Sequence, residues 1–161
     1  MRLRAAIEHL HGSTLDLAET LSTIAQRHAS DHDLFHMGRL LSERCAGLGP
    51  LLEPFLIPDP GDDAGRAEGS LSLPSTVRRG VGEVSDAAGQ PGPILLRDLR
   101  EAEIEAHACV TGWVVVHQGA MAARDQTLLD VCAVGMDETR RIERWLTTRI
   151  KESAPQILMG S

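Results

Sequence analysis

The stretch from Leu95 to Gln156 decides the fold: LLRDLREAEIEAHACVTGWVVVHQGAMAARDQTLLDVCAVGMDETRRIERWLTTRIKESAPQ. Its apolar and small residues recur every three or four positions in two runs, which is the spacing of a helix face. The first run is Leu95, Leu99, Ala102, Ala106, Cys109, Trp113, Val116 and Ala120, and the second is Leu128, Cys132, Gly135, Thr139, Ile142 and Leu146. Between them, Ala123-Arg124-Asp125 offers a turn and an N-cap. The stretch therefore predicts an antiparallel pair of helices over about 93–122 and 125–152.

An earlier part of the chain has the same kind of pattern. Ile7, Leu10, Leu17, Leu21 and Ile24 form one apolar stripe, and Leu34, Leu41, Leu48 and Phe55 form another. They predict helices over about 3–28 and 31–56, and the short polar connection Ala29–Asp33 makes these helices antiparallel neighbours. The sequence GLGP at Gly47–Pro50 predicts that the second helix bends or ends early.

The two helix pairs are joined by residues of a different kind. Residues 57–92 are rich in Gly, Pro, Ser and Asp and show little periodicity, so we expect a long flexible crossover. Pro93 suits the first turn of the third helix, and Pro155 is expected to end the fourth. With 161 residues, the chain fits one domain. The predicted fold is an all-α, four-helix bundle of two antiparallel helical hairpins.

Composition narrows the classes of function. The formal net charge of −7 argues against nonspecific binding of nucleic acid, which needs a basic surface. No apolar run reaches the roughly 18 residues of a membrane span, and no signal peptide is recognisable at the N-terminus. Cys45, Cys109 and Cys132 lie in helical patterns without metal-site spacing, so we expect buried free thiols in a cytoplasmic protein.

The layout of two hairpins and one long connection resembles the ferritin-like superfamily. The chain is most similar to an uncharacterised bacterial branch, expected to be actinobacterial, near the stress-associated ferritin-like proteins. The resemblance rests on IAQRHASDHDLFHMGRLLSERCAG (Ile24–Gly47), LLRDLREAEIEAH (Leu95–His107) and DETRRIERWLTTRIKESAPQ (Asp137–Gln156). It covers roughly three quarters of the chain as two hairpins. It implies a ferritin-like four-helix bundle, and side-by-side association of such bundles implies a homodimer.

Di-iron members of that superfamily use a Glu from each of two helices and a Glu-x-x-His from each of the other two. Here the only Glu-x-x-His is Glu8–His11, near the N-terminus. The fourth helix has Glu138-Thr139-Arg140-Arg141, with Arg141 where the histidine belongs, and a protonated guanidinium cannot ligate a cation. The departure argues against iron binding, ferroxidase activity and mineral storage. The residues left for an unusual site are Glu8, His11, Glu105 and Glu138.

Ion pairs between the helices could take the place of a metal site in holding the bundle together. Counting outward from the turn near Ala123 places Glu105 near Arg141 and Glu101 near Arg144 to Arg149. Arg44 falls in an apolar register and would need a partner such as Glu138 if buried. These pairs are either ties between helices or solvated surface pairs worth roughly 0–1 kcal/mol each.

Three histidines are spaced four apart at His28, His32 and His36, but the polar turn falls among them, which favours capping and surface roles. His107 and Cys109 lie two apart on a helix and point in different directions, so they do not form a nucleophile and base. His117 is expected beside the apolar seam. Gly80-Val81-Gly82 lacks the context and the lysine of a phosphate-binding loop.

Three hypotheses follow. The leading one is a ferritin-like bundle of unknown function that lacks the di-iron site, is not an enzyme, and uses no cofactor. The second is an iron- or manganese-binding bundle with the unusual site named above. The third is a structural or interaction module that acts through the crossover or the apolar C-terminal tail QILMGS. We assign no catalytic, cofactor-binding or metal-binding residue, and we expect a homodimer, with an unidentified protein partner left open.

Overall fold

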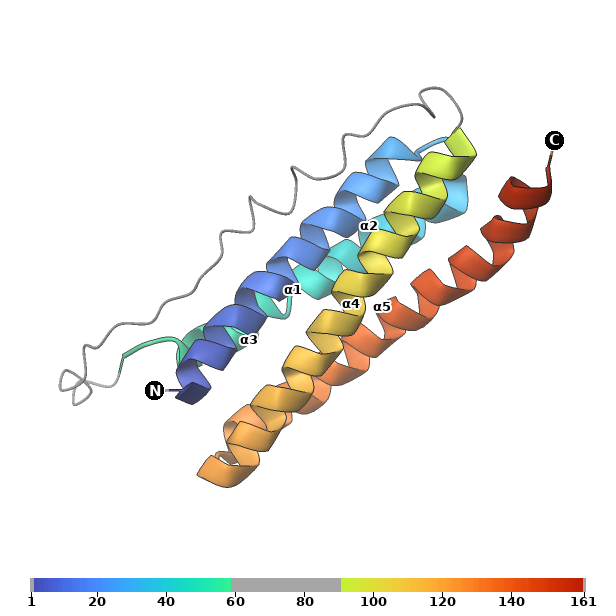
Figure 1. Ribbon diagram of the computed structural model, residues 1–161. Coiled ribbons are helices and arrows are strands. Elements are labelled where there is room, and N and C mark those ends of the chain that lie inside the picture. Colours follow the sequence, from blue (N-terminus) through green and yellow to red (C-terminus); the bar gives the residue numbers. More distant parts are fainter. Residues whose placement is uncertain (1, 59–90, 161) are drawn as a thin grey trace.

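A computed structural model describes residues 2–58 and 91–160 of the chain. The described residues form a bundle of helices without strands (Figure 1). Its long helices are α1 (Arg2–Arg27), α2 (His32–Ala46), α4 (Pro91–Ala123) and α5 (Gln126–Met159), with α3 (Gly49–Leu52) and the 3₁₀ helix η1 (Glu53–Phe55) after α2. The prediction of an all-α bundle of two hairpins is confirmed, while the expected crossover at 57–92 lies almost wholly outside the described residues.

In each hairpin, one aspartate caps the N-terminus of the second helix. Asp31 is the N-cap of α2 and accepts from the backbone N–H of Leu34 at 3.0 Å, and Asp125 does the same for Leu128 in α5 at 3.0 Å. Each carboxylate satisfies an N–H that has no partner inside its helix. The predicted turns are therefore where the sequence placed them, and Arg124 turns the chain with a φ of 56°.

The second predicted helix does not run unbroken to residue 56. α2 ends at Ala46 with Gly47 as C-cap, and α3 restarts the chain with Pro50 in its first turn. The proline has no N–H to continue a helix, so the predicted early end is confirmed. Residues of α3 and η1 then cover the end of the bundle near the start of α1.

The third helix begins slightly earlier than expected, at Pro91, because first-turn prolines lose no hydrogen bond. The expectation that Pro155 ends the fourth helix is wrong, since α5 continues to Met159. The last turn after Pro155 is held by packing: Ile157 lies against Gly92 of α4, where an added Cβ would be 3.0 Å away. The C-terminal QILM is consequently helical instead of an extended tail.

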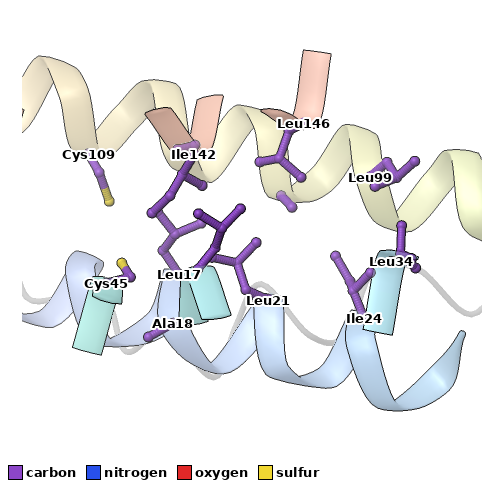
Figure 2. Packing of buried hydrophobic residues seen from close by; sticks show 13 residues of the cluster. Leu17, Ala18, Leu21, Ile24, Leu34, Cys45, Leu99, Cys109, Ile142 and Leu146 are labelled. Carbon is purple, nitrogen blue, oxygen red and sulfur yellow. The ribbon is translucent and has the colours of Figure 1, made fainter. Parts of the chain in front are cut away.

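The helices run up, down, down and up in chain order (Figure 1). α1 packs on α2 and α4, α4 packs on α5, and α2 meets α5 at a few points. Figure 2 shows aliphatic side chains of α1, α4 and α5 converging between the helices, with Leu17, Leu21, Ile142 and Leu146 at the middle. A second apolar cluster around Trp113 continues the core toward the α4–α5 turn.

Candidate functional site

The most buried charge among the described residues is Asp98 of α4, only 3% exposed. Its Oδ2 accepts a hydrogen bond from Arg27 Nη1 at 2.8 Å and lies 2.9 Å from His28 Nε2, at the end of α1. Arg97 Nη2 lies 3.3 Å from the other carboxylate oxygen. Burial alone raises the pKa of Asp98, but hydrogen bonds from His28 and Arg27, together with the Arg27 charge, outweigh it and hold the pKa below the ordinary 3.8.

A second ion pair lies beside this cluster and joins the other two helices. Arg149 of α5 donates from Nη2 to Asp31 Oδ2 at 2.6 Å and from Nη1 to Glu152 at 3.4 Å. Asp31 is also the N-cap of α2, so one carboxylate orders the α1–α2 turn and receives the arginine. The two ion-pair groups therefore connect all four long helices at one end of the bundle.

An open pocket of about 540 Å³ lies at this end, between the α1–α2 turn and the facing ends of α4 and α5. Its wall includes His28, Asp31, Arg149, Ser153 and Ile157. The charges on the wall already compensate one another, because Arg149 is bound by Asp31 and Glu152 while His28 is bound to Asp98. The two ion-pair groups, Asp98 with Arg27 and His28 and Arg149 with Asp31 and Glu152, hold the four long helices together at this end of the bundle.

The four residues considered for an unusual metal site are not brought together. Glu8 lies on the exposed side of α1 and pairs with Arg4 at 3.1 Å. His11 lies near Gly49 of α3, while Glu138 faces Arg44 and Arg141. Across residues 2–58 and 91–160, no three His, Cys, Asp or Glu side chains are grouped closely enough to hold a metal ion.

The predicted partnership of Arg44 and Glu138 is present, at 3.6 Å between Nε and Oε2. Arg44 is 46% exposed, however, so it is a surface residue and does not need neutralising in the core. Arg141 also forms ion pairs with Glu138, at 3.9 Å, and with Asp137, at 2.9 Å. Of the two predictions for Arg44, the solvated surface pair is the one that the structure supports.

The counted register between α4 and α5 needs a correction of about one turn. Thr147 Oγ1 bonds to Glu103, and His107 Nδ1 lies 2.7 Å from Glu143. These contacts place Arg141 level with Cys109, which is one turn beyond Glu105. The same contacts place Glu101 level with Arg149, at the end of the predicted range of Arg144 to Arg149, although Arg149 forms its ion pairs with Asp31 and Glu152.

The histidines occupy separate places. His32 and His36 stack on each other on the surface of α2, with ring centroids 4.8 Å apart, whereas His28 belongs to the buried Asp98 cluster. The expectation that His28, His32 and His36 do not act together is confirmed, but His28 is buried and not a surface residue. His107 is exposed and lies beside Glu143, and His117 is half-buried.

The three cysteines are free and buried, as predicted. Cys45 of α2 and Cys109 of α4 approach α1 from two sides, and their thiols donate to the neighbouring carbonyls of Thr14 and Ser13, both at 3.3 Å. Figure 2 shows the two sulfur atoms inside the bundle, each pointing toward the other helix. Burial raises the pKa of each thiol to about 12, which keeps both protonated and unreactive.

One surface was missed by the sequence reasoning: the face of α4 that points away from the core. From Ala106 to Ala123 the chain has no Asp, Glu, Lys or Arg. The exposed residues of this stretch other than His107 and Ala123, with Ile104 before it, form the α4 outer face: Ile104, Ala108, Thr111, Val114, Val115, Gln118, Met121 and Ala122. Among them Ile104, Val115 and Met121 are each more than half exposed. The missing charges were the signal that could have found it.

Comparison with known proteins found no matching family model, no similar curated protein and no similar solved structure. Among the described residues, no helix is both long enough and apolar enough to cross a membrane.

Proposed function

We propose that the chain is a ferritin-like four-helix bundle without a di-iron centre, which acts by binding a protein and not by catalysis. The up-down-down-up order of the helices supports the ferritin-like part of the proposal, because that order requires one long connection between two hairpins. Free buried thiols suit a reducing compartment such as the cytoplasm.

The observation that carries the proposal is the content of the bundle interior. A di-iron centre would need carboxylates and histidines pointing inward from all four helices at one level. The inward residues around the level of Cys45 and Cys109 are instead Thr14, Leu17, Leu41, Cys45, Ala106, Cys109, Thr139 and Ile142, all buried. Aliphatic side chains and protonated thiols do not fit an iron–carboxylate centre, whose ligands are oxygen and nitrogen atoms.

The protein-binding part of the proposal rests on the α4 outer face. A helix on the surface of a soluble bundle normally carries polar and charged residues on the side away from the core. α4 carries valine, isoleucine and methionine there, and large exposed apolar surfaces on soluble proteins commonly mark interaction sites.

Metal analysis of untagged protein tests the first part. We expect far less than one Fe, Mn or Zn per chain, and no faster oxidation of Fe(II) than in buffer. A content of roughly one or two ions per chain that disappears in Glu8→Ala/His11→Ala would contradict the proposal. The matched control is Glu53→Ala/His36→Ala, which removes an exposed Glu and an exposed His from the other part of the hairpin.

A further inference from the structure

Two exposed histidines lie one helical turn apart at the start of α2. His32 and His36 are four positions apart, a spacing that puts both side chains on one side of a helix. Their rings are stacked, with centroids 4.8 Å apart and 26° between the ring planes. Two imidazole rings therefore lie side by side on the surface of the bundle.

The rings of this pair are not held by other polar groups. In the described part of the chain, His32 and His36 form no hydrogen bond or ion pair, and their rings contact each other and Phe35. The buried His28, in contrast, is held by Asp98. Nitrogen atoms of the exposed pair are therefore available to a ligand from solution. A neutral imidazole has one free lone pair, and its nitrogen is a preferred ligand of Zn(II), Cu(II) and Ni(II).

We propose that His32 and His36 form an exchangeable surface site for one divalent transition-metal ion of the Zn(II), Ni(II) and Cu(II) class. Each imidazole supplies one nitrogen, and water completes the coordination of the ion. Two histidines at positions i and i+4 on one helix face also bind zinc in the H-E-x-x-H motif, so the spacing suits a shared ion. The backbone of α2 fixes the positions of both ligands in advance, which lowers the entropy lost on binding.

The charges around the pair favour a cation. Asp33 in the first turn of α2 is exposed, forms no ion pair within the described residues, and offsets the positive end of the helix dipole. The whole chain carries a net charge of −7, which attracts cations. Arg39, the nearest basic residue along α2, has its own partners: its guanidinium lies 5.7 Å from the centroid of the Phe35 ring and 3.7 Å from Glu43.

The surface site is separate from the interior to which the proposed function refers, and it does not rest on that proposal. A di-iron centre would be buried and would retain its ions during purification. Two exposed histidines and water give a weaker site, with a Kd on the order of 10–100 μM. An ion held this weakly is removed by dialysis against a chelator, so the surface site is compatible with a metal-free interior.

Calorimetric titration of the untagged full chain with nickel chloride, after EDTA treatment and dialysis, tests the proposal. We expect one Ni(II) per chain. His32→Asn and His36→Asn should each weaken binding roughly tenfold or more, because one imidazole with water no longer chelates the ion. The matched control is His9→Asn, which removes an exposed histidine of α1 and should leave binding unchanged.

A double variant tests whether the spacing matters. His36→Asn/Arg39→His keeps two histidines on α2 but places them seven positions apart, about 10 Å along the helix axis. One ion cannot bind both rings at that separation, so we expect no recovery of binding. Recovery in this variant would contradict a shared ion. Circular dichroism of every variant checks that the bundle remains helical.

Three results would overturn the proposal. They are the absence of binding up to about 1 mM Ni(II), binding that His32→Asn and His36→Asn leave intact, and an equal loss of binding with His9→Asn.

Metal content before EDTA treatment separates this proposal from the metal-free interior. Iron that is lost in Glu8→Ala/His11→Ala would contradict the metal-free interior alone. Zinc that is lost in Glu53→Ala/His36→Ala and retained in Glu8→Ala/His11→Ala would support the surface site. A chain that binds no Ni(II) would contradict the surface site alone.

Discussion

The indole ring of Trp113 lies directly against the backbone of Gly135, in the place where any other residue would have its Cβ. A Cβ added to Gly135 would overlap three carbons of the ring. α4 and α5 can approach closely at this level because one of the two facing residues has no side chain. The largest buried side chain of the bundle is thus accommodated by its smallest residue.

We expect Gly135→Ala to destabilise the protein by about 1–3 kcal/mol, the usual result of forcing extra volume into a packed core. The control is Gly12→Ala in α1, where an added Cβ meets nothing within 4 Å. That substitution should stabilise the helix by up to about 1 kcal/mol, the difference in helix propensity. Urea unfolding of both variants measures the effects, and two changes of the same sign would show that the indole is not where the structure has it.

Removing the ring gives the complementary prediction. Trp113→Ala should cost roughly 3–5 kcal/mol, as for other large aromatic truncations in cores. Thermal unfolding measures it, and an unchanged Tm would mean that Trp113 is not in the core of the bundle.

Asp98→Asn should reduce stability by about 1.5–3 kcal/mol, because the buried hydrogen bonds from Arg27 and His28 lose their charged acceptor. The matched control is Arg97→Gln, which removes a 53% exposed arginine bound to the same carboxylate and should cost less than about 1 kcal/mol. Urea unfolding at neutral pH compares the two.

The same pair predicts a pH dependence. The pKa of Asp98 is lowered in the folded protein, so its contribution is complete above the unfolded value near 3.8 and is lost as pH falls through the lower folded pKa. The stability difference between wild type and Asp98→Asn should therefore shrink in acid. A difference that stays constant down to pH 2, roughly two units below that value, would contradict the assignment.

The thiols give a prediction that needs no variant. Burial raises the pKa of Cys45 and Cys109 to about 12 and that of Cys132 to about 11. A disulfide reagent at pH 8 should therefore label none of them in the folded chain and all three in denaturant, since the thiolate is the nucleophile. Rapid labelling of any one in the native state would show that its helix opens locally.

Pro155 interrupts the hydrogen bonding of α5, since it has no N–H for the carbonyl of Lys151. Pro155→Ala restores that donor without removing the contact between Ile157 and Gly92. We expect slower hydrogen exchange at Gln156–Met159 and a small rise in Tm. Lys151→Ala, also on the exposed side of α5, serves as the control and should leave the exchange of the last turn unchanged.

Regular spacing made most of the fold predictable. The stripes from Ile7 to Ile24 and from Leu128 to Leu146 determine which face of each helix is buried, and every one of their named residues proved buried. The prediction that Pro155 ends the fourth helix was wrong because it considered only the hydrogen bonds inside that helix and not its packing on α4. The contact of Ile157 with Gly92 joins positions far apart in the chain, and no local pattern reveals it.

The two ion-pair groups around Asp98 and Arg149 were not predicted either, because their partners lie far apart in the chain. Asp98 and its partner His28 are 70 positions apart, and no motif around either residue indicates that the two side chains meet. The register of α4 on α5 was off by a turn because counting from Ala123 ignores the residues spent in reversing direction at Arg124. The α4 outer face was also missed, although the run of uncharged residues after Glu105 is a local signal from which it could have been predicted.

α1 and α5 run in the same direction, so Arg2 and Gly160 lie at opposite ends of the bundle (Figure 1). The 34 residues of α5 make the molecule a rod of about 50 Å, at 1.5 Å of rise per residue. Groups attached at the two ends are therefore held apart at a set distance, as by a spacer. A bundle of alternating up and down helices would instead bring both attachments to the same end.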